Sequence, residues 1–163
     1  MPYTYKTKEK ALEDVELKLV PVEEVPDEVP LLVYNTLYLN WDVPHEPKEK
    51  WYDGSHGGRF LVARKGDDTL LGACRLMPVA EETPEGIQIR QVVVTADSQG
   101  MGIGRLLMLE AEEIGRSEGA SELFLWSRMP AYRFYESLDY VYTSEAWTSE
   151  LTGLQHRTMT KYL

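Results

Sequence analysis

The feature that most constrains the fold is an apolar run that leads directly into a glycine-rich turn. Residues 92–94 are three valines, and residues 99–105 read Gln-Gly-Met-Gly-Ile-Gly-Arg. A continuous apolar run is typical of a strand buried on both faces. Glycine permits positive φ and close backbone approach to a ligand. The N–H groups that open the next helix, predicted over residues 102–115, favour a phosphate or pyrophosphate.

Phosphate-binding turns differ in the spacing of their glycines and in the residues that come next. A P-loop requires Gly-Lys-Ser/Thr, and the sequence Gly104-Arg105-Leu106 excludes it. A dinucleotide fingerprint requires G-x-G-x-x-G inside a parallel βαβ unit, whereas the spacing here is G-x-G-x-G after strands predicted to form hairpins. A glycine-rich helix start without any ligand is a third interpretation. The glycines alone leave the choice open.

The hydrophobic pattern predicts a mixed α/β chain whose first part is largely antiparallel. A Gly-Asp-Asp turn at residues 66–68 predicts a hairpin. Helices are predicted from Pro26 onward, over residues 102–115 and over residues 130–138. Residues 41–58 are predicted to form a loop or a broken helix. The predicted strands cover residues 15–20, 60–64, 70–76, 87–95, 123–126, 141–149 and 154–161.

Length, charge and cysteine content exclude several classes of protein. The 163 residues predict one domain, and a single cysteine excludes an internal disulfide or a Cys-based zinc cluster. The net charge of −10 disfavours nucleic acid and anionic membrane as partners; it either attracts a cationic amine or only maintains solubility. No apolar run reaches the ~20 residues of a membrane span, and the polar N-terminus is unlike a secretory signal. We therefore expect a cytoplasmic protein.

Five segments, in order along the chain, resemble motifs of the GNAT acyl-CoA N-acyltransferases. Residues 99–104 fit the Gln/Arg-x-x-Gly-x-Gly/Ala signature, and Ala-Tyr-Arg-Phe-Tyr-Glu-Ser-Leu-Asp-Tyr at residues 131–140 resembles A-x-x-F-Y-E-x-L-G-F. Residues 72–76 resemble a G-x-x-R-L strand and residues 90–94 an R-Q-x-x-V strand of one bacterial branch. Residues 153–159 resemble the G-I-x-H-x-x-M ending of that branch.

The resemblance implies a fold and a cosubstrate. The implied GNAT fold has a central, mixed, mostly antiparallel sheet of six to seven strands flanked by about four helices, in a single domain of residues 1–163. The implied cosubstrate is acetyl-CoA, with no metal. The pantetheine arm would pair with the backbone of Val92, Val93 and Val94. The pyrophosphate would be held by the loop residues Gln99, Gly100, Met101, Gly102, Ile103, Gly104 and Arg105.

The resemblance also implies a proton donor. Tyr135 matches the tyrosine that protonates the departing CoA thiolate in this family. A phenol with a pKa near ~10 keeps its proton at neutral pH and donates it to developing sulfur charge. The alternative is a core tyrosine whose hydroxyl already has a partner.

The general base is left open by the sequence. Some relatives carry a glutamate on the strand before the loop, where this chain offers Gln88, Arg90 and Gln91. The remaining candidates are Glu85, His56 and, favoured among them, His156. A water relay, or an amine that binds already neutral, would need no dedicated base.

The acceptor pocket is predicted in the segment from about Tyr34 to His56, because in the GNAT fold the first helices and their connection cover the acceptor side. Trp41, Glu46 and Asp53 place an aromatic ring and acids together, which suits a cationic amine through cation–π contact and charge pairing. A packed, solvated loop is the alternative. The predicted activity is acetyl transfer to a primary amine of a small molecule or a protein, in a possible homodimer. Alternatives are a CoA-binding sensor without turnover and an N-acyltransferase for longer acyl thioesters.

Overall fold

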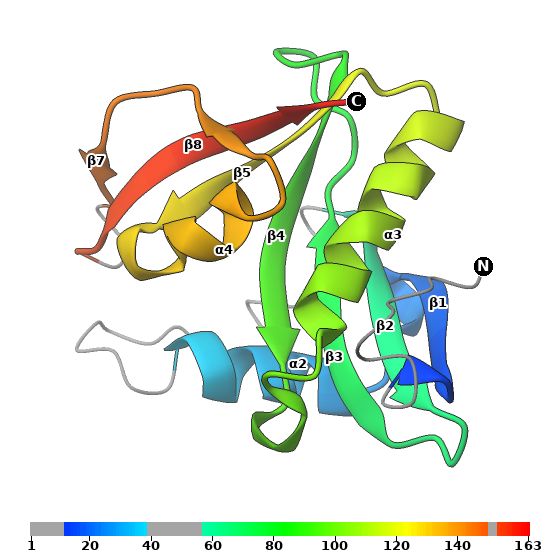
Figure 1. Ribbon diagram of the computed structural model, residues 1–163. Coiled ribbons are helices and arrows are strands. Elements are labelled where there is room, and N and C mark those ends of the chain that lie inside the picture. The colour runs from blue at the N-terminus through cyan, green and yellow to red at the C-terminus, as the bar shows by residue number, and fades with distance from the viewer. Residues whose placement is uncertain (1–11, 39–56, 150–152) are drawn as a thin grey trace.

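The computed structural model describes residues 12–38, 57–149 and 153–163, and their centre is one eight-stranded sheet (Figure 1). The strand order is β1-β2-β3-β4-β5-β8-β6, and β7 pairs with β8. The strands are β1 (Val15–Pro21), β2 (Arg59–Lys65), β3 (Leu70–Leu76), β4 (Gly86–Val94), β5 (Glu122–Arg128), β6 (Val141–Tyr142), β7 (Trp147–Thr148) and β8 (Gln155–Tyr162). The α-helices in the described ranges are α2 (Glu28–Val33), which continues as the π-helical turn η2 (Tyr34–Tyr38), α3 (Ile103–Ser117) and α4 (Tyr132–Glu136).

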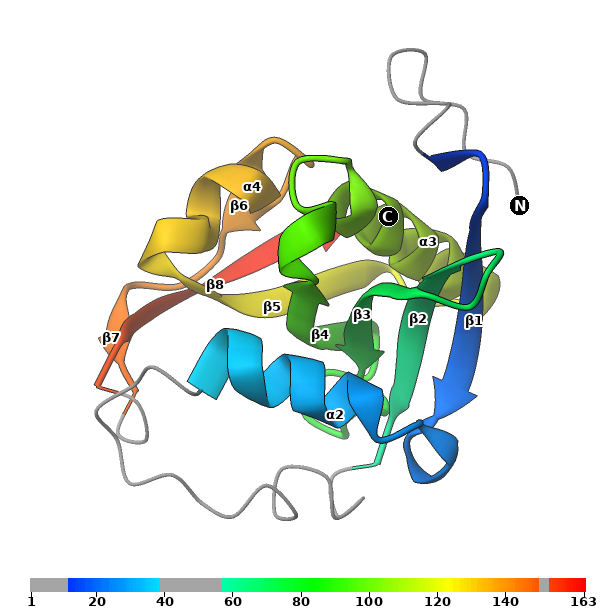
Figure 2. The same ribbon diagram turned by 90° about the horizontal axis from the view of Figure 1, so that it is seen from below.

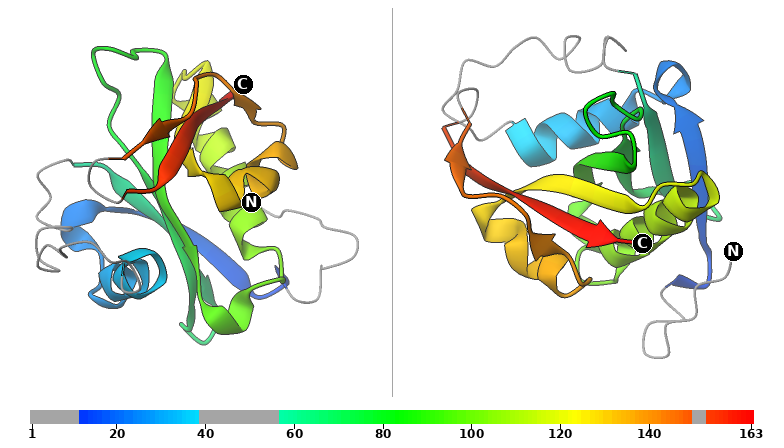
Figure 3. Two further views of the ribbon diagram at one scale, coloured as in Figure 1. Left: turned by 90° about the vertical axis from the view of Figure 1, so that its left-hand side faces the viewer. Right: turned by 90° about the horizontal axis from the view of Figure 1, so that it is seen from above.

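The helices cover opposite faces of the sheet. In Figure 2, α2 lies below the sheet and α3 and α4 lie above it. The right-hand view of Figure 3, from the opposite side, shows the same two faces with their order reversed. The larger core fills the space under α3 and α4, where Leu107 and Met108 are fully buried. A smaller core joins Val29 and Val33 of α2 to Val93 of β4. α3 therefore buries the apolar stripe that its periodicity predicts. α2 buries Val29 and Val33 instead of the predicted face that begins at Leu31, which is exposed.

One pair of neighbouring strands is parallel. β4 and β5 run in the same direction and pair only at Gly86↔Glu122, Ile87↔Leu123 and Gln88↔Phe124. Beyond these pairs the two strands separate, and Figure 1 shows β5 turning away from β4. The other strand pairs are antiparallel. The predicted mixed, mostly antiparallel sheet is confirmed.

The last third of the chain differs from the prediction in one element. Residues 141–149, predicted as a single strand, form the two short strands β6 and β7, so the sheet has eight strands instead of six to seven. The backbone N–H of Thr158 donates to the Ser144 Oγ at 2.9 Å. A serine side chain thus takes the place of a backbone acceptor and interrupts the ladder between the two strands.

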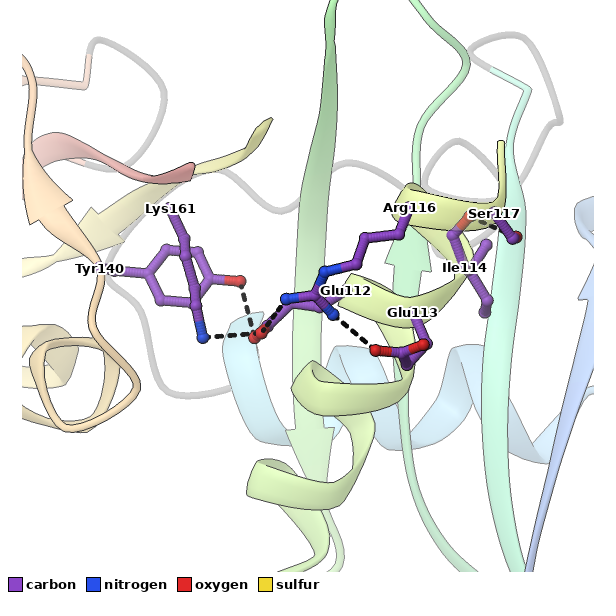
Figure 4. A network of polar contacts seen from close by, with 7 residues as sticks. All are labelled: Glu112, Glu113, Ile114, Arg116, Ser117, Tyr140 and Lys161. Carbon is purple, nitrogen blue, oxygen red and sulfur yellow. Dashed lines mark hydrogen bonds and ion pairs between the residues drawn. The ribbon is translucent and has the colours of Figure 1, made fainter. Parts of the chain in front are cut away.

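A buried carboxylate ties α3 to the C-terminal strand. Glu112 on α3 is only 1% exposed, and Lys161 of β8 places its Nζ 2.7 Å from Glu112 Oε1 (Figure 4). The Tyr140 hydroxyl donates to Glu112 Oε2 at 3.4 Å, and Arg116 lies 4.0 Å from Oε1. A buried charge needs such partners, because desolvation alone would strongly disfavour it.

The described part of the chain contains no helix that is both long and apolar enough to cross a membrane.

Candidate active site

The divergence of β4 from β5 creates the first part of the site. β4 runs on to Val94, well past its last pairing with β5 at Gln88. A strand edge that lacks a neighbouring strand can pair with the backbone-like amides of an extended ligand. The predicted pantetheine-pairing residues, Val92, Val93 and Val94, lie in this diverging part. Val93 is buried toward α2, whereas Val92 and Val94 pack toward the core under α3.

A β-bulge at Gln91 reshapes β4 inside the diverging part. Ala73 pairs with Val93 but Arg75 pairs with Arg90, so the β4 residues between them face one residue of β3. Gln91 has a φ of 55°, a region that residues other than glycine seldom adopt. A bulge of this kind bends a strand and breaks its pairing locally. The bulge was not predicted from the sequence. The sequence feature that could have indicated it is the change from alternation at residues 87–89 to the continuous run of valines at residues 92–94.

The glycine-rich turn joins β4 to α3 and has the backbone geometry expected of it. Gly100 has a φ of 81°, and a Cβ there would meet no atom within 4 Å. Gly102 has a φ of 91° and caps α3, whose first helical bond runs from the Leu106 N–H to the Gly102 carbonyl oxygen at 3.0 Å. The N–H groups of Ile103 and Gly104 precede that bond, as at any helix start. The turn therefore presents the N–H groups that begin α3, with open space at Gly100, whereas the Met101 N–H donates to the Ser98 carbonyl oxygen at 3.3 Å.

Gly104 differs from the other glycines of the turn. A Cβ on Gly104 would lie 3.2 Å from the Phe134 ring, so this glycine lets α4 pack closely against the start of α3. Tyr135, the predicted proton donor, follows Phe134 in α4. The packing of Phe134 against Gly104 therefore holds Tyr135 close to the glycine-rich turn. Gln99, Met101 and Arg105 complete the predicted pyrophosphate loop along the same segment.

Tyr135 is buried, yet the described residues supply no hydrogen-bond partner for its hydroxyl. The residue is 9% exposed and its ring packs against Phe134 and Tyr140, with centroids 5.0 and 6.0 Å apart. Burial raises the pKa of Tyr135 well above its ordinary value, so the phenol keeps its proton. Tyr140 differs, because its hydroxyl donates to Glu112. Tyr140 therefore matches the alternative interpretation, a core tyrosine whose hydroxyl has a hydrogen-bond partner, and Tyr135 does not match it.

Cys74 is the residue that the β4 bulge faces, and it is fully buried on β3. Burial raises the pKa of its thiol to about 12. Since the thiolate is the nucleophilic form of cysteine, this thiol is unreactive at neutral pH. Acyl transfer by way of a cysteine thioester therefore has no support in the site.

His156 lies at the start of β8, on the face opposite to Tyr135. Its Nδ1 is 3.1 Å from the Leu154 carbonyl oxygen, and its ring stacks on Trp147 with centroids 5.8 Å apart. Its cross-strand neighbour is Arg128, the last residue of β5. Burial, and secondarily Arg128, lowers the pKa of His156 below 6.5, so the ring is neutral at pH 7. The structure thus places a neutral imidazole near the open end of the β4–β5 divergence.

The other predicted site residues divide into two groups. Glu85 precedes β4 at its paired end and lies 3.5 Å from the Ser121 hydroxyl, far along the strand from the bulge. Trp41, Glu46, Asp53 and His56 lie outside the described residues. The described residues contain no cluster of three or more His, Cys, Asp or Glu side chains that could hold a metal ion.

Comparison with known proteins decides the family. The family model of the Acetyltransferase (GNAT) family matches residues 30–140, which is more than half of the chain. The chain belongs to the GNAT family. The matched segment contains β2 to β5, the glycine-rich turn and α4, so it covers most of the site described above, with His156 beyond its end.

Individual relatives of this GNAT protein are distant. A UPF0039 protein of Schizosaccharomyces pombe is 32% identical over 98 residues, which are 59% of this chain and 62% of that protein. A GCN5-related N-acetyltransferase from Kribbella flavida superposes with a TM-score of 0.72 at 15% identity, covering 93% and 99% of the two chains. The spermidine/spermine N-acetyltransferase SpeG from Vibrio cholerae superposes with a TM-score of 0.65 at 13% identity, covering 92% and 93%. At these identities the structural likeness shows the fold alone.

Proposed function

We propose that this protein is an acetyl-CoA-dependent N-acetyltransferase that transfers the acetyl group directly to a primary amine of a small molecule or a protein. The observation that carries the proposal is the Tyr135 hydroxyl: buried, protonated, without a described partner, and held by Phe134 against the glycine-rich turn. Family membership supports the reaction class.

Two parts of acetyl-CoA, the pantetheine arm and the pyrophosphate, would be bound by backbone groups of the site. The diverging edge of β4, at Val92 to Val94, would pair with the pantetheine amides. The backbone N–H groups of the glycine-rich turn, from Gln99 to Arg105, would hold the pyrophosphate, with the helix dipole of α3 favouring its charge. The open space beside Gly100 leaves room for that contact.

The proposed chemistry uses one proton donor and no covalent enzyme intermediate. The neutral amine attacks the thioester carbonyl carbon, the carbon–sulfur bond breaks, and the CoA thiolate takes the proton of the Tyr135 hydroxyl. The attacking nitrogen gives up one proton to the general base or to water, and the Tyr135 phenolate regains a proton from solvent. A donor placed where charge develops stabilises the transition state more than the ground state. The high pKa of Cys74 supports direct transfer, because a two-step route through an acyl-cysteine would need a thiolate.

The first test is binding. Acetyl-CoA at 100 times its Kd should stabilise the folded protein by about 2.7 kcal/mol and raise its Tm by roughly 5–10 °C. A thermal-shift titration measures this, with NAD and ATP as controls and longer acyl-CoAs to compare chain lengths. A folded sample that no CoA species stabilises would contradict the proposal. Binding without thiol release across a broad amine panel would favour the CoA-sensor alternative.

We propose His156 as the general base, and the pH dependence of kcat/KM tests it. Because the pKa of His156 lies below 6.5, wild-type activity should fall as the pH drops through a value under 6.5, where the ring becomes protonated. His156→Gln should abolish this acidic limb. Both enzymes should be assayed with one acceptor, so that the protonation of the amine contributes equally to both profiles. An unchanged acidic limb in His156→Gln would exclude the role.

A further inference from the structure

Two arginine side chains lie on the α2 side of strands β3 and β4, in a protein of net charge −10. Ile87 and Ile89 join the core under α3, so alternation along β4 puts Gln88 and Arg90 on the α2 side. Arg75, the cross-strand partner of Arg90, shares that side, where it lies over the Phe60 ring of the α2 core. Arg75 is 4% exposed and donates to the Gly57 carbonyl oxygen.

Gln88 adds a hydrogen-bond donor that the described residues leave without an acceptor. Its side chain is buried, at 8% exposure, and its Oε1 accepts a hydrogen bond from Arg90 Nε at 3.1 Å. This bond fixes the orientation of the amide and identifies the other atom as the NH2 group. That Nε2 has no hydrogen-bond partner among the described residues. A buried donor without an acceptor is costly, which points to an oxygen atom supplied by a ligand.

An aromatic row continues from this pair of residues across β5 to β7 and β8. The Arg90 guanidinium lies over the Trp126 ring, 5.0 Å from its centroid, and Trp126 is 51% exposed. Trp126 meets Trp147 edge to face at 6.1 Å, and Trp147 stacks on His156. One side of the diverging strands therefore carries, in spatial order, the Gln88–Arg90 pair, the two tryptophan rings and the proposed base His156.

We infer that the acceptor amine also carries a carboxylate, which is bound by the Gln88 amide NH2 and the Arg90 guanidinium while its hydrocarbon part lies on Trp126. The inference rests on the proposed acetyltransferase function and names its substrate class. A guanidinium fork matches the planar geometry of a carboxylate, and the nearby Arg75 adds to the attraction. An acceptor bearing only ammonium groups, such as a polyamine, has no oxygen atom to accept a hydrogen bond from the Gln88 NH2 group.

The inference runs against the cationic acceptor that Glu46 and Asp53 favour in the sequence. Those acids lie outside the described residues. The described residues on the α2 side of β4 offer the Gln88 hydrogen-bond donor and the Arg90 guanidinium instead. An amino acid, or a peptide with a carboxylate near its amine, satisfies both the Gln88 donor and the Arg90 charge.

Matched acceptors that differ by one carboxylate test the inference. Phenylalanine is compared with phenethylamine, tryptophan with tryptamine and ornithine with putrescine, each by kcat/KM in a thiol-release assay. Wild type should prefer the carboxylated member of at least one pair by about tenfold to a hundredfold, the worth of a hydrogen-bonded charge. Gln88→Leu and Arg90→Met should each reduce that preference by about tenfold or more. The differing basicity of the two amines cancels when variant and wild type are compared on the same pair.

Arg157→Met is the matched control. Arg157 also stacks on an aromatic ring, that of Tyr142 at 4.0 Å, but it shares the side of β8 that holds the buried Met159. Its replacement should leave the preference unchanged. Equal or better use of the decarboxylated amines, turnover of none of these acceptors, or a preference that survives both Gln88→Leu and Arg90→Met would overturn the inference. A protein that does not bind acetyl-CoA would contradict the proposed function instead, and the thermal-shift titration separates the two failures.

Discussion

Replacing Tyr135 by phenylalanine is expected to lower kcat by about 10²–10³-fold while leaving acetyl-CoA affinity within about twofold of wild type. The substitution removes one hydroxyl and keeps the ring that packs against Phe134 and Tyr140. Because the hydroxyl has no partner among the described residues, its loss leaves none of their polar groups unsatisfied. The measurement is steady-state thiol release together with a direct acetyl-CoA titration.

Tyr140→Phe is the control for that experiment. It removes a hydroxyl from an adjacent, similarly buried ring, but this hydroxyl donates to Glu112. We expect kcat to stay within a few-fold of wild type and the free energy of unfolding to fall by about 1.5 kcal/mol, the lower end for a hydrogen bond to a charged group, because this bond is long at 3.4 Å. Equal losses of kcat in the two variants would mean that Tyr135 acts only through packing.

Replacing Lys161 by methionine is expected to lower the free energy of unfolding by about 3–5 kcal/mol, as when a buried ion pair loses one partner. Glu112 is almost fully buried, and Lys161 Nζ lies 2.7 Å from its carboxylate, against 4.0 Å for Arg116 (Figure 4). Methionine approximates the length of the lysine stem, so packing changes little and the loss of charge dominates. Urea unfolding at 25 °C and pH 7 measures the difference.

The second salt bridge of α3 provides a control for this measurement. Glu113 lies 2.6 Å from Arg116, but both side chains are about 45% exposed. Glu113→Gln should change the free energy of unfolding by at most about 1 kcal/mol, because solvent screens an exposed pair. If Lys161→Met proved as mild as Glu113→Gln, Glu112 would not depend on Lys161 for its stability.

The sequence determined the parts of this protein that local patterns encode. The valine run, the glycines after it and the apolar stripe of α3 are contiguous, so they predicted the strand, the turn and the helix that form one wall of the site. The resemblance of residues 131–140 likewise singled out Tyr135. The predictions of the strand, the turn and the helix succeed because period, positive φ and helix capping depend on neighbours within a few residues. The role of Tyr135 stays a prediction.

Only the tertiary structure decided how β4 bends and which residues face it. The bulge at Gln91 depends on the register with β3, and glutamine has no intrinsic preference for positive φ. The Gln88–Arg90 pair meets Trp126 because β5 lies beside β4, although 36 residues separate Arg90 from Trp126 in the sequence. Glu112 similarly finds Lys161 across 49 residues. Such contacts arise from strand order and side-chain burial, which hydrophobic periodicity does not specify.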